Sequence, residues 1–142
     1  ADAPESDGPE VQLLASGVGV PWVLEARRIL VQDWGVRASV WSVTSWGELR
    51  REALAVEKQN FLNPSAPRRI PYLENKLASA QGPFVATSDY DHAVPDLIRP
   101  WIPGSYHVLG ADGFGFSDTR AAARRHYLID AQAEPRSTAA RR

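Results

Sequence analysis

The sequence predicts an α/β domain in which a mainly parallel sheet is covered by helices on both faces. Two observations carry this prediction. Four short runs rich in β-branched and other apolar residues alternate with segments in which apolar residues recur every three or four positions. Each connection between two such runs is long enough to hold a helix, which is what neighbouring parallel strands require.

The chain is long enough for one domain, since it has 142 residues. Residues 1–10 are acidic, contain proline and hold almost no large apolar group, so we expect a flexible arm or linker there. The α/β domain is then expected over residues 11–131. Residues 132–142 are polar, contain proline and show no helical stripe, which predicts a disordered tail.

The first strand and the first helix are expected at residues 11–16 and 21–34. The run VQLLAS is short and apolar and is followed by two glycines, as in a buried strand that enters a tight turn. Pro21 lies near the first turn of the helix, where a missing N–H group costs little. The apolar stripe of this helix comprises Trp22, Val23, Ala26, Ile29, Leu30 and Trp34.

The second strand and helix follow directly. The run ASVWSVTS is β-branched and aromatic, which predicts a strand within residues 38–45. Ser45 and Glu48 form an S-x-x-E capping box, in which each side chain satisfies a free backbone donor at the start of a helix. The helix is expected to run from the next residue to the pair Asn63 and Pro64, because proline disfavours helical geometry in the residue before it.

The remaining elements are recognised by the same signals. Gly-Pro introduces a third apolar run, and Pro95 would break a longer helix, so the best-supported helix in its segment starts around that residue. The expected elements are a short helix over 72–78, a strand over 82–88, a helix from about Pro95, a strand over 106–111 and a final helix over 117–127.

Charge and composition exclude several classes of function. The 16 basic and 17 acidic residues give a net charge of −1, so no overall field attracts nucleic acid or an anionic membrane, and neither is expected as a partner. No apolar run approaches the roughly 18 residues of a membrane span. The absence of cysteine excludes disulfides, thiolate metal sites and a cysteine nucleophile, and it fits the reducing cytoplasm.

The glycine-rich turn GADGFGFSDTR is a candidate anion site. Backbone N–H groups at a helix start attract negative charge, so the participants would be Gly113, Gly115, Ser117, Asp118 and Arg120. The turn lacks the third glycine of a dinucleotide fingerprint and any Gly-Lys-Ser/Thr element, and its aspartates repel phosphate. The alternative is a plain strand-to-helix turn in which Ser117 or Asp118 caps the helix.

The three histidines, His92, His107 and His126, show no metal-ligand spacing. A pair formed by His92 with Asp91 or Asp89 has the residue types of a general base, but no nearby serine or cysteine goes with it. Surface or capping positions are the alternative for these histidines.

Two arginines, Arg68 and Arg69, lie on a proline-bearing loop and have the charge to bind phosphate, although such short basic runs are usually solvated. The five tryptophans are expected to anchor a core or a protein interface. A hydrolase is disfavoured because no G-x-S-x-G elbow occurs. The residues by themselves therefore leave open an anion-binding or partner-binding module without catalytic activity.

Several blocks occur in a family-specific order: VQLLASG, DWGVRASVWSVTSWGELRREALAVEKQNFLNP, RIPYLE, GPFVATSDY, IRPWIP and VLGADGFGFSDTR. Together they resemble the C-terminal domain of the homodimeric, bacterial type of pyruvate dehydrogenase E1 component. The similarity covers roughly residues 11–130. It implies a transketolase-like three-layer α/β/α fold, with a mostly parallel mixed sheet of about five strands.

The resemblance also implies a role. An E1 enzyme of this type holds thiamine diphosphate and magnesium between its other domains, decarboxylates pyruvate, and passes the acetyl unit to lipoyl groups of the dihydrolipoyl acetyltransferase component. Its C-terminal domain supports assembly with the remaining E1 domains and the second E1 subunit. The family's cofactor motif, Gly-Asp-Gly followed at a distance by an asparagine pair, is absent here. We therefore assign no catalytic, cofactor-binding or metal residue, and we expect the chain alone to be inactive.

After Ala131 the chain departs from the family pattern, which continues with an apolar helix. Here the sequence is QAEPRSTAARR. Apolar surface near the last strand is then expected to lie uncovered, as a site for pairing with another chain or for aggregation.

Overall fold

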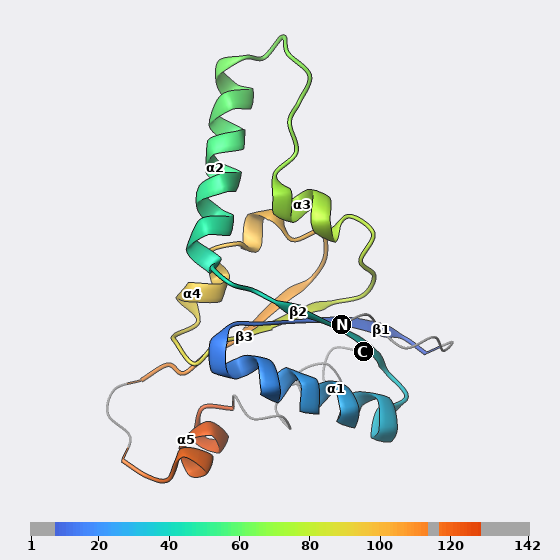
Figure 1. Ribbon diagram of the computed structural model, residues 1–142, viewed down its shortest axis with the longest axis vertical. Helices are drawn as coiled ribbons and strands as arrows, with labels where there is room; N and C mark the ends of the chain where they lie inside the picture. Colours follow the sequence, from blue (N-terminus) through green and yellow to red (C-terminus); the bar gives the residue numbers. More distant parts are fainter. Residues whose placement is uncertain (1–7, 114–116, 129–142) are drawn as a thin grey trace.

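A computed structural model describes residues 8–113 and 117–128. Its centre is a parallel sheet in the order β2-β1-β3-β4 (Figure 1). The parallel α/β prediction is confirmed, with four strands within the described ranges in place of about five. The strands are β1 (Glu10–Ala15), β2 (Arg37–Ser42), β3 (Phe84–Thr87) and β4 (Tyr106–Leu109).

One face of the sheet packs against α1 (Val20–Trp34). Successive side chains of a strand point to opposite faces, so Val11 and Leu13 of β1 meet Val23 and Leu30 of the helix. The helix α5 (Arg120–His126) lies on the same side of the sheet (Figure 1). Of the predicted stripe, Trp34 is 52% exposed, because the chain reverses at Gly35 in a left-handed conformation and Val36 fills the core instead.

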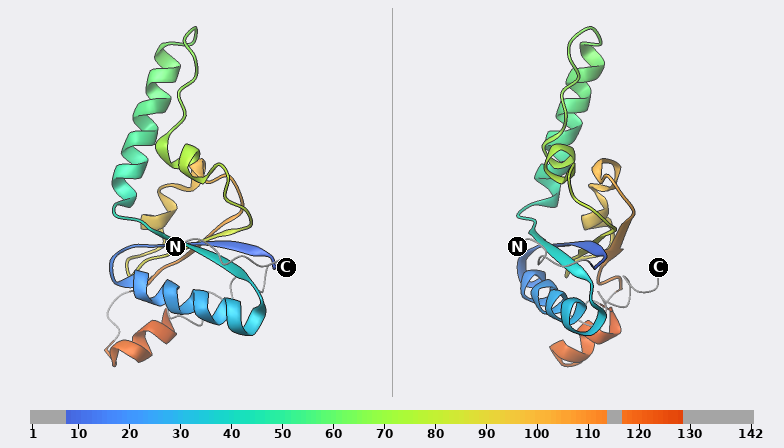
Figure 2. Two further views of the ribbon diagram at one scale, coloured as in Figure 1. Left: turned by 45° about the vertical axis from the view of Figure 1, so that its right-hand side comes forward. Right: turned by 90° about the vertical axis from the view of Figure 1, so that its right-hand side faces the viewer.

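The other face packs against a second group of helices, as the three-layer prediction requires (Figures 1 and 2). Its core joins Leu14 and Phe84 of the sheet to Trp46, Leu77 and Trp101. The helices are α2 (Trp46–Leu62), α3 (Tyr72–Leu77), α4 (Ala93–Asp96) and the 3₁₀ turn η2 (Arg99–Trp101), while a second 3₁₀ turn, η1 (Gly17–Gly19), joins β1 to α1.

The second helix begins where the sequence predicts. The Ser45 hydroxyl accepts a hydrogen bond from the Glu48 N–H at 3.2 Å, which satisfies one free donor of the first turn. The reciprocal bond of the predicted capping box, from the Ser45 N–H to the Glu48 side chain, is not formed between these described residues, and the Glu48 carboxylate pairs with Arg51 instead. The helix ends at Leu62, directly before the predicted pair of Asn63 and proline. Local side-chain chemistry therefore sets both ends of this element.

The end of α2 and the connection that follows it project away from the sheet, and we call residues 57–71 the arm (Figures 1 and 2). Asn60 closes the arm: its side-chain amide donates to the Arg69 carbonyl at 2.8 Å and accepts from the Arg69 N–H at 2.9 Å. The arm presents apolar side chains to solvent. Phe61 is 83% exposed, and Leu62 and Ile70 are exposed as well.

Buried Gln12 crosslinks the sheet. Its amide donates to the Gln81 carbonyl and to Glu10, each at 2.8 Å, and its oxygen accepts from the Trp41 indole at 2.8 Å. Because an unpaired buried amide is costly, this set of bonds ties β1 to the edge strand β2 and to the segment that enters β3.

Several predicted boundaries are wrong by one or more residues. The strands β3 and β4 are shorter than their runs, since β3 extends only from Phe84 to Thr87 and β4 ends at Leu109. The helix expected to start around Pro95 is a short helix that begins at Ala93, so Pro95 lies in the first turn, where no N–H partner is lost.

The flexible N-terminal segment predicted at residues 1–10 and the disordered tail predicted at 132–142 stay predictions, since residues 1–7 and 129–142 lie outside the described ranges. The departure from the family pattern after Ala131 lies outside them too. No helix in the described part of the chain is both long and apolar enough to cross a membrane.

Candidate functional site

The candidate site lies at the carboxyl edge of the sheet, between β1 and β3. From β1 the chain crosses one face through α1 to reach β2, whereas from β3 it crosses the other face through α4 to reach β4 (Figure 1). The strand order therefore reverses between β1 and β3. In open α/β sheets, such a reversal leaves a crevice outside the carboxyl ends of the strands, where ligands commonly bind. We call this site the crevice.

The floor of the crevice is built from small residues at the strand ends. Gly19 lies beside Thr87, and a Cβ on residue 19 would be in ordinary van der Waals contact with the Thr87 methyl carbon, at 3.6 Å. Ser88 is buried and its hydroxyl accepts from the Tyr90 N–H at 3.1 Å. The Ser88 N–H donates to the Leu109 carbonyl at 3.1 Å, so the β3–β4 ladder continues into the floor.

One wall of the crevice is the face of α5 that carries Arg120 and Arg124. The cavity between this face and the strand ends has a volume of about 410 Å³. The Arg124 guanidinium lies over the Trp22 ring of α1, 4.3 Å from its centroid, which is the geometry of a cation–π contact. The cavity is lined by Val18, Asp89, Ala111, Arg120, Ala123, Arg124 and Tyr127.

Of the predicted anion-site participants that the structure describes, Arg120 is the one that lines this cavity. Gly113 has a φ of 140°, and a Cβ on it would lie 3.2 Å from the Tyr127 ring. Ser117 and Asp118 are exposed, and neither caps α5. The cap is Thr119, whose hydroxyl accepts from the Ala122 N–H at 3.3 Å, because Thr119 is the residue directly before the first helical turn.

Gly115 lies outside the described residues. The expectation that the turn binds an anion stays a prediction. In the described residues, the positive charge beside the turn comes from Arg120 and Arg124 on one face of α5.

Of the two alternatives for His92, the structure shows the surface position, and the acidic partner of His92 is neither Asp91 nor Asp89. His92 Nδ1 pairs with the Asp112 carboxylate, and the His92 backbone N–H donates to the same carboxylate at 2.9 Å. The partner comes from the segment after β4, because the two loops at the carboxyl ends of β3 and β4 lie side by side. His92 and Asp112 are both largely exposed, and the pair joins these two loops.

The two arginines of the proline-bearing loop are engaged within the arm and its base. The Arg68 guanidinium reaches the Glu74 carboxylate at 3.3 Å, and the Arg69 guanidinium contacts the Gln59 side chain. Both are exposed, so the ion pair of Arg68 is worth little.

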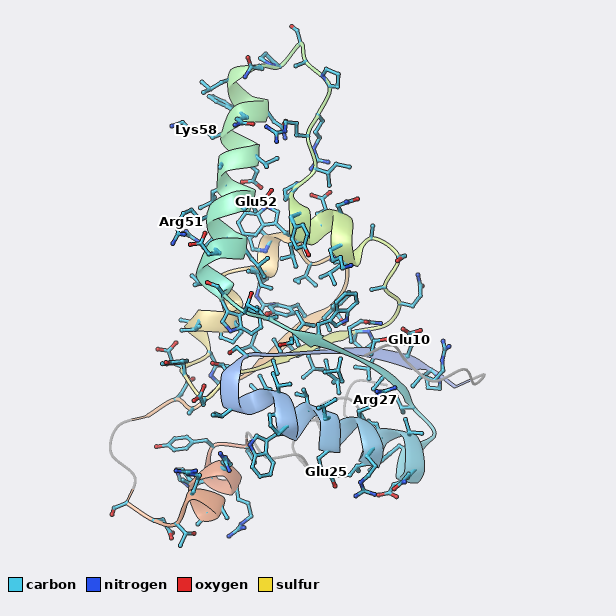
Figure 3. The ribbon with its side chains drawn as sticks, viewed as in Figure 1. Glu10, Glu25, Arg27, Arg51, Glu52 and Lys58 are labelled. Atoms are coloured by element: carbon cyan, nitrogen blue, oxygen red, sulfur yellow. The ribbon has the colours of Figure 1, made fainter. Side chains whose placement is uncertain are left out.

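A second cleft, which we call the apolar cleft, lies at the base of the arm and has a volume of about 410 Å³. Figure 3 shows Glu52 on the side of α2 that faces this region, while Arg51 and Lys58 point away from it. Glu52 accepts the Tyr72 N–H at 3.1 Å and so holds α3 against α2. The apolar lining comprises Leu14, Trp41, Val43, Leu49, Leu73 and Leu77.

Residues 8–113 and 117–128 contain no cluster of side chains that could by itself hold a metal ion. No three His, Asp or Glu side chains in these ranges lie together in a way that could hold a metal ion. We therefore derive no cofactor chemistry from the residues of this chain.

Sequence reasoning did not bring Arg124, Trp22 and Asp89 together in one site, since it considered Trp22 only as part of an apolar stripe and Asp89 only as a partner of a histidine. Arg124 had a usable signal, since it follows Arg120 by four positions and so shares its face of the helix. Trp22 and Asp89 follow the ends of two different strands, and only the strand order brings them together.

Comparison with known proteins agrees with this architecture. A model of the family described as "Transketolase-like TK C-terminal domain" matches residues 2–130. Among solved structures, a "Split gene transketolase, inactive beta4 tetramer" superposes with a TM-score of 0.60 at 16% sequence identity, covering 94% of this chain and 39% of that one. At this identity the second comparison shows a shared fold.

Three bacterial relatives carry the name "Pyruvate dehydrogenase E1 component". The protein of Mycolicibacterium smegmatis is 54% identical over 130 residues, that of Mycobacterium tuberculosis 50% over 132, and that of Escherichia coli K12 41% over 128. These alignments cover 92%, 93% and 89% of this chain. The chain spans 14% of the length of each relative.

Proposed function

The chain belongs to the family of transketolase-like C-terminal domains, and on this basis we propose that it serves as the assembly domain of a pyruvate dehydrogenase E1-like enzyme. The observation that carries the proposal is the 54% identity to one E1 component over 92% of the chain. A match of that extent relates the whole described fold, and not only one motif, to these enzymes.

The chemistry belongs to the longer enzyme. We propose that thiamine diphosphate and magnesium are held by its other domains, where pyruvate is decarboxylated and the acetyl unit passes to lipoyl groups of the dihydrolipoyl acetyltransferase component. This chain contributes no catalytic residue and is inactive alone. The enzyme acts in the cytoplasm.

Two surfaces support a role in assembly. The arm holds exposed apolar side chains in a fixed position, because Asn60 bonds both backbone groups of Arg69. The apolar cleft lies beside it and opens to solvent. Large exposed apolar side chains on an ordered protrusion are typical of surfaces that become buried against another protein. We propose that the remaining E1 domains or the second E1 subunit cover them.

A chimaera tests this proposal. The matching segment of the Mycolicibacterium smegmatis relative is replaced by this chain, and pyruvate-dependent reduction of an artificial electron acceptor is measured with thiamine diphosphate and magnesium present. We expect the chimaera to be active and the isolated chain to show no turnover. Thiamine-dependent decarboxylation by the isolated chain would refute the proposal that catalysis belongs to the other domains of the enzyme.

The contribution of the arm is tested in the same chimaera. The double variant Phe61→Ser, Leu62→Ser removes the exposed apolar tip, and we expect a smaller assembled fraction in sedimentation velocity and a proportional loss of activity. The matched control is Leu24→Ser, since Leu24 is also an exposed apolar residue but lies on α1. Equal behaviour of the two variants would show that the arm is not an assembly surface.

A further inference from the structure

We propose that the crevice binds a small organic anion, one that carries a phosphate or carboxylate group and also a hydrogen-bond donor such as an amine or hydroxyl. This site is separate from the arm and the apolar cleft, so it goes beyond the assembly role. Its support comes from the shape of the cavity, its place in the sheet and the charges of its lining.

The shape and position of the crevice suit a small ligand. Its volume of about 410 Å³ falls in the range of roughly 300–1,000 Å³ that is usual for small-molecule sites. It opens at the point where the strand order reverses, outside the carboxyl ends of β1 and β3. It continues into the floor beside Gly19 and Thr87, since Val18, Asp89 and Arg124 line both parts.

The positive charge of the crevice comes from two guanidinium groups on one helix face. Arg120 and Arg124 are four residues apart on α5, so their side chains are neighbours. Within the described residues, Arg120 makes no ion pair or hydrogen bond. Arg124 stacks on Trp22, which fixes the guanidinium plane and leaves its N–H groups for an acceptor. Such a pair matches the oxygens of a phosphate or carboxylate.

The negative charge of Asp89 gives the crevice its selectivity. Asp89 follows β3 and lines the same cavity, and within the described residues its carboxylate pairs with no cation. A bare dianion would be repelled by this carboxylate, whereas a ligand with an ammonium or hydroxyl group donates to it. Of the remaining lining residues, Val18, Ala111 and Ala123 are apolar and suit a short carbon spacer, and Tyr127 completes the lining.

Isothermal titration calorimetry of the full 142-residue chain tests the proposal with four probes: inorganic phosphate, phosphoethanolamine, glycerol 3-phosphate and β-alanine. We expect saturable binding of at least one probe that has both an acidic group and a donor, with inorganic phosphate weaker. The order of phosphoethanolamine and β-alanine identifies phosphate or carboxylate as the preferred group. Tryptophan fluorescence, with Trp22→Phe as the reference, reports whether the bound ligand lies beside Trp22.

Three charge variants on one helix supply the controls. Arg120→Gln and Arg124→Gln are each expected to weaken binding about tenfold, which is the usual effect of losing one charge-assisted hydrogen bond. Arg125→Gln is the matched control, because Arg125 lies on α5 but does not line the cavity. Asp89→Asn should reduce the preference for phosphoethanolamine over inorganic phosphate. Circular dichroism checks that each variant keeps its fold.

Two results would overturn the proposal. One is the absence of saturable binding of every probe up to about 10 mM, a concentration at which even a weak site is occupied. The other is an equal loss of affinity in all three arginine variants, which would show general charge attraction and no defined site. Neither result would affect the assembly role, which the chimaera tests independently.

Discussion

Replacing Gly82 by alanine should lower the stability of the domain more than a glycine-to-alanine change at any other described glycine with a positive φ. Gly82 has a φ of 81°, and a Cβ on it would lie 1.8 Å from the Glu10 carbonyl oxygen and 2.7 Å from the carbonyl carbon. Both are backbone atoms at the start of β1, so no flexible side chain is available to move aside.

The magnitude follows from two contributions. A left-handed conformation costs an alanine about 1–2 kcal/mol. Relief of the clash requires β1 and the Gly82 turn to separate by about 1 Å, which strains or breaks the 2.9 Å hydrogen bond from the Gln12 N–H to the Pro83 carbonyl and its neighbours, at about 1 kcal/mol for each bond lost. We expect a total loss of at least about 3 kcal/mol in the free energy of unfolding.

Gly17→Ala is the matched control. Gly17 also has a positive φ, of 50°, but a Cβ there meets no atom within 4 Å, so only the conformational cost of about 1–2 kcal/mol applies. Urea unfolding followed by far-ultraviolet circular dichroism measures both variants. A Gly82→Ala protein no less stable than Gly17→Ala would refute the steric reasoning.

Three further predictions concern single side chains. Burial raises the pKa of Tyr106 well above its ordinary value of about 10, so the wild-type protein should lose stability as the pH rises above about 10. The Tyr106 hydroxyl donates to a main-chain carbonyl at 2.8 Å, so Tyr106→Phe should be about 1 kcal/mol less stable than the wild type at pH 7. The variant should lack the loss of stability above pH about 10, and urea unfolding at pH 7 and above pH about 10 measures both effects. Ser45→Ala should destabilise by about 1 kcal/mol in thermal unfolding, and no change would mean that its cap bond is dispensable. Asn60→Ala should speed hydrogen exchange of the Arg69 amide with little change in global stability, whereas unchanged exchange would contradict the closing role of Asn60.

Elements whose cause is local were predictable. The Ser45 hydroxyl needs only the next turn of backbone to cap α2, and the position of Pro21 at the start of α1 depends on its own missing N–H. The blocks DWGVRASVWSVTS and GPFVATS contain β2 and β3. These signals depend on residues that lie close together in the sequence, so they do not depend on the tertiary structure.

The cap of α5 and the partner of His92 show where local reasoning fails. Three adjacent residues, Ser117, Asp118 and Thr119, can each cap a helix, and only the direction in which the chain enters α5 selects Thr119. His92 has acidic neighbours in sequence, yet its partner Asp112 lies 20 residues away. The pairing depends on the adjacency of β3 and β4, which the sequence of either loop does not contain.

The sequence by itself therefore determined the α/β class, the parallel sheet, the limits of α2 and the resemblance to E1 components, because each rests on residue type and spacing. Only the tertiary structure decided which side chains come together in the crevice. Trp22, Asp89 and Arg124 come from three distant segments, and the strand order that brings them to one edge is set by the packing of both helix layers on the sheet. The crevice exists because the strand order reverses between β1 and β3.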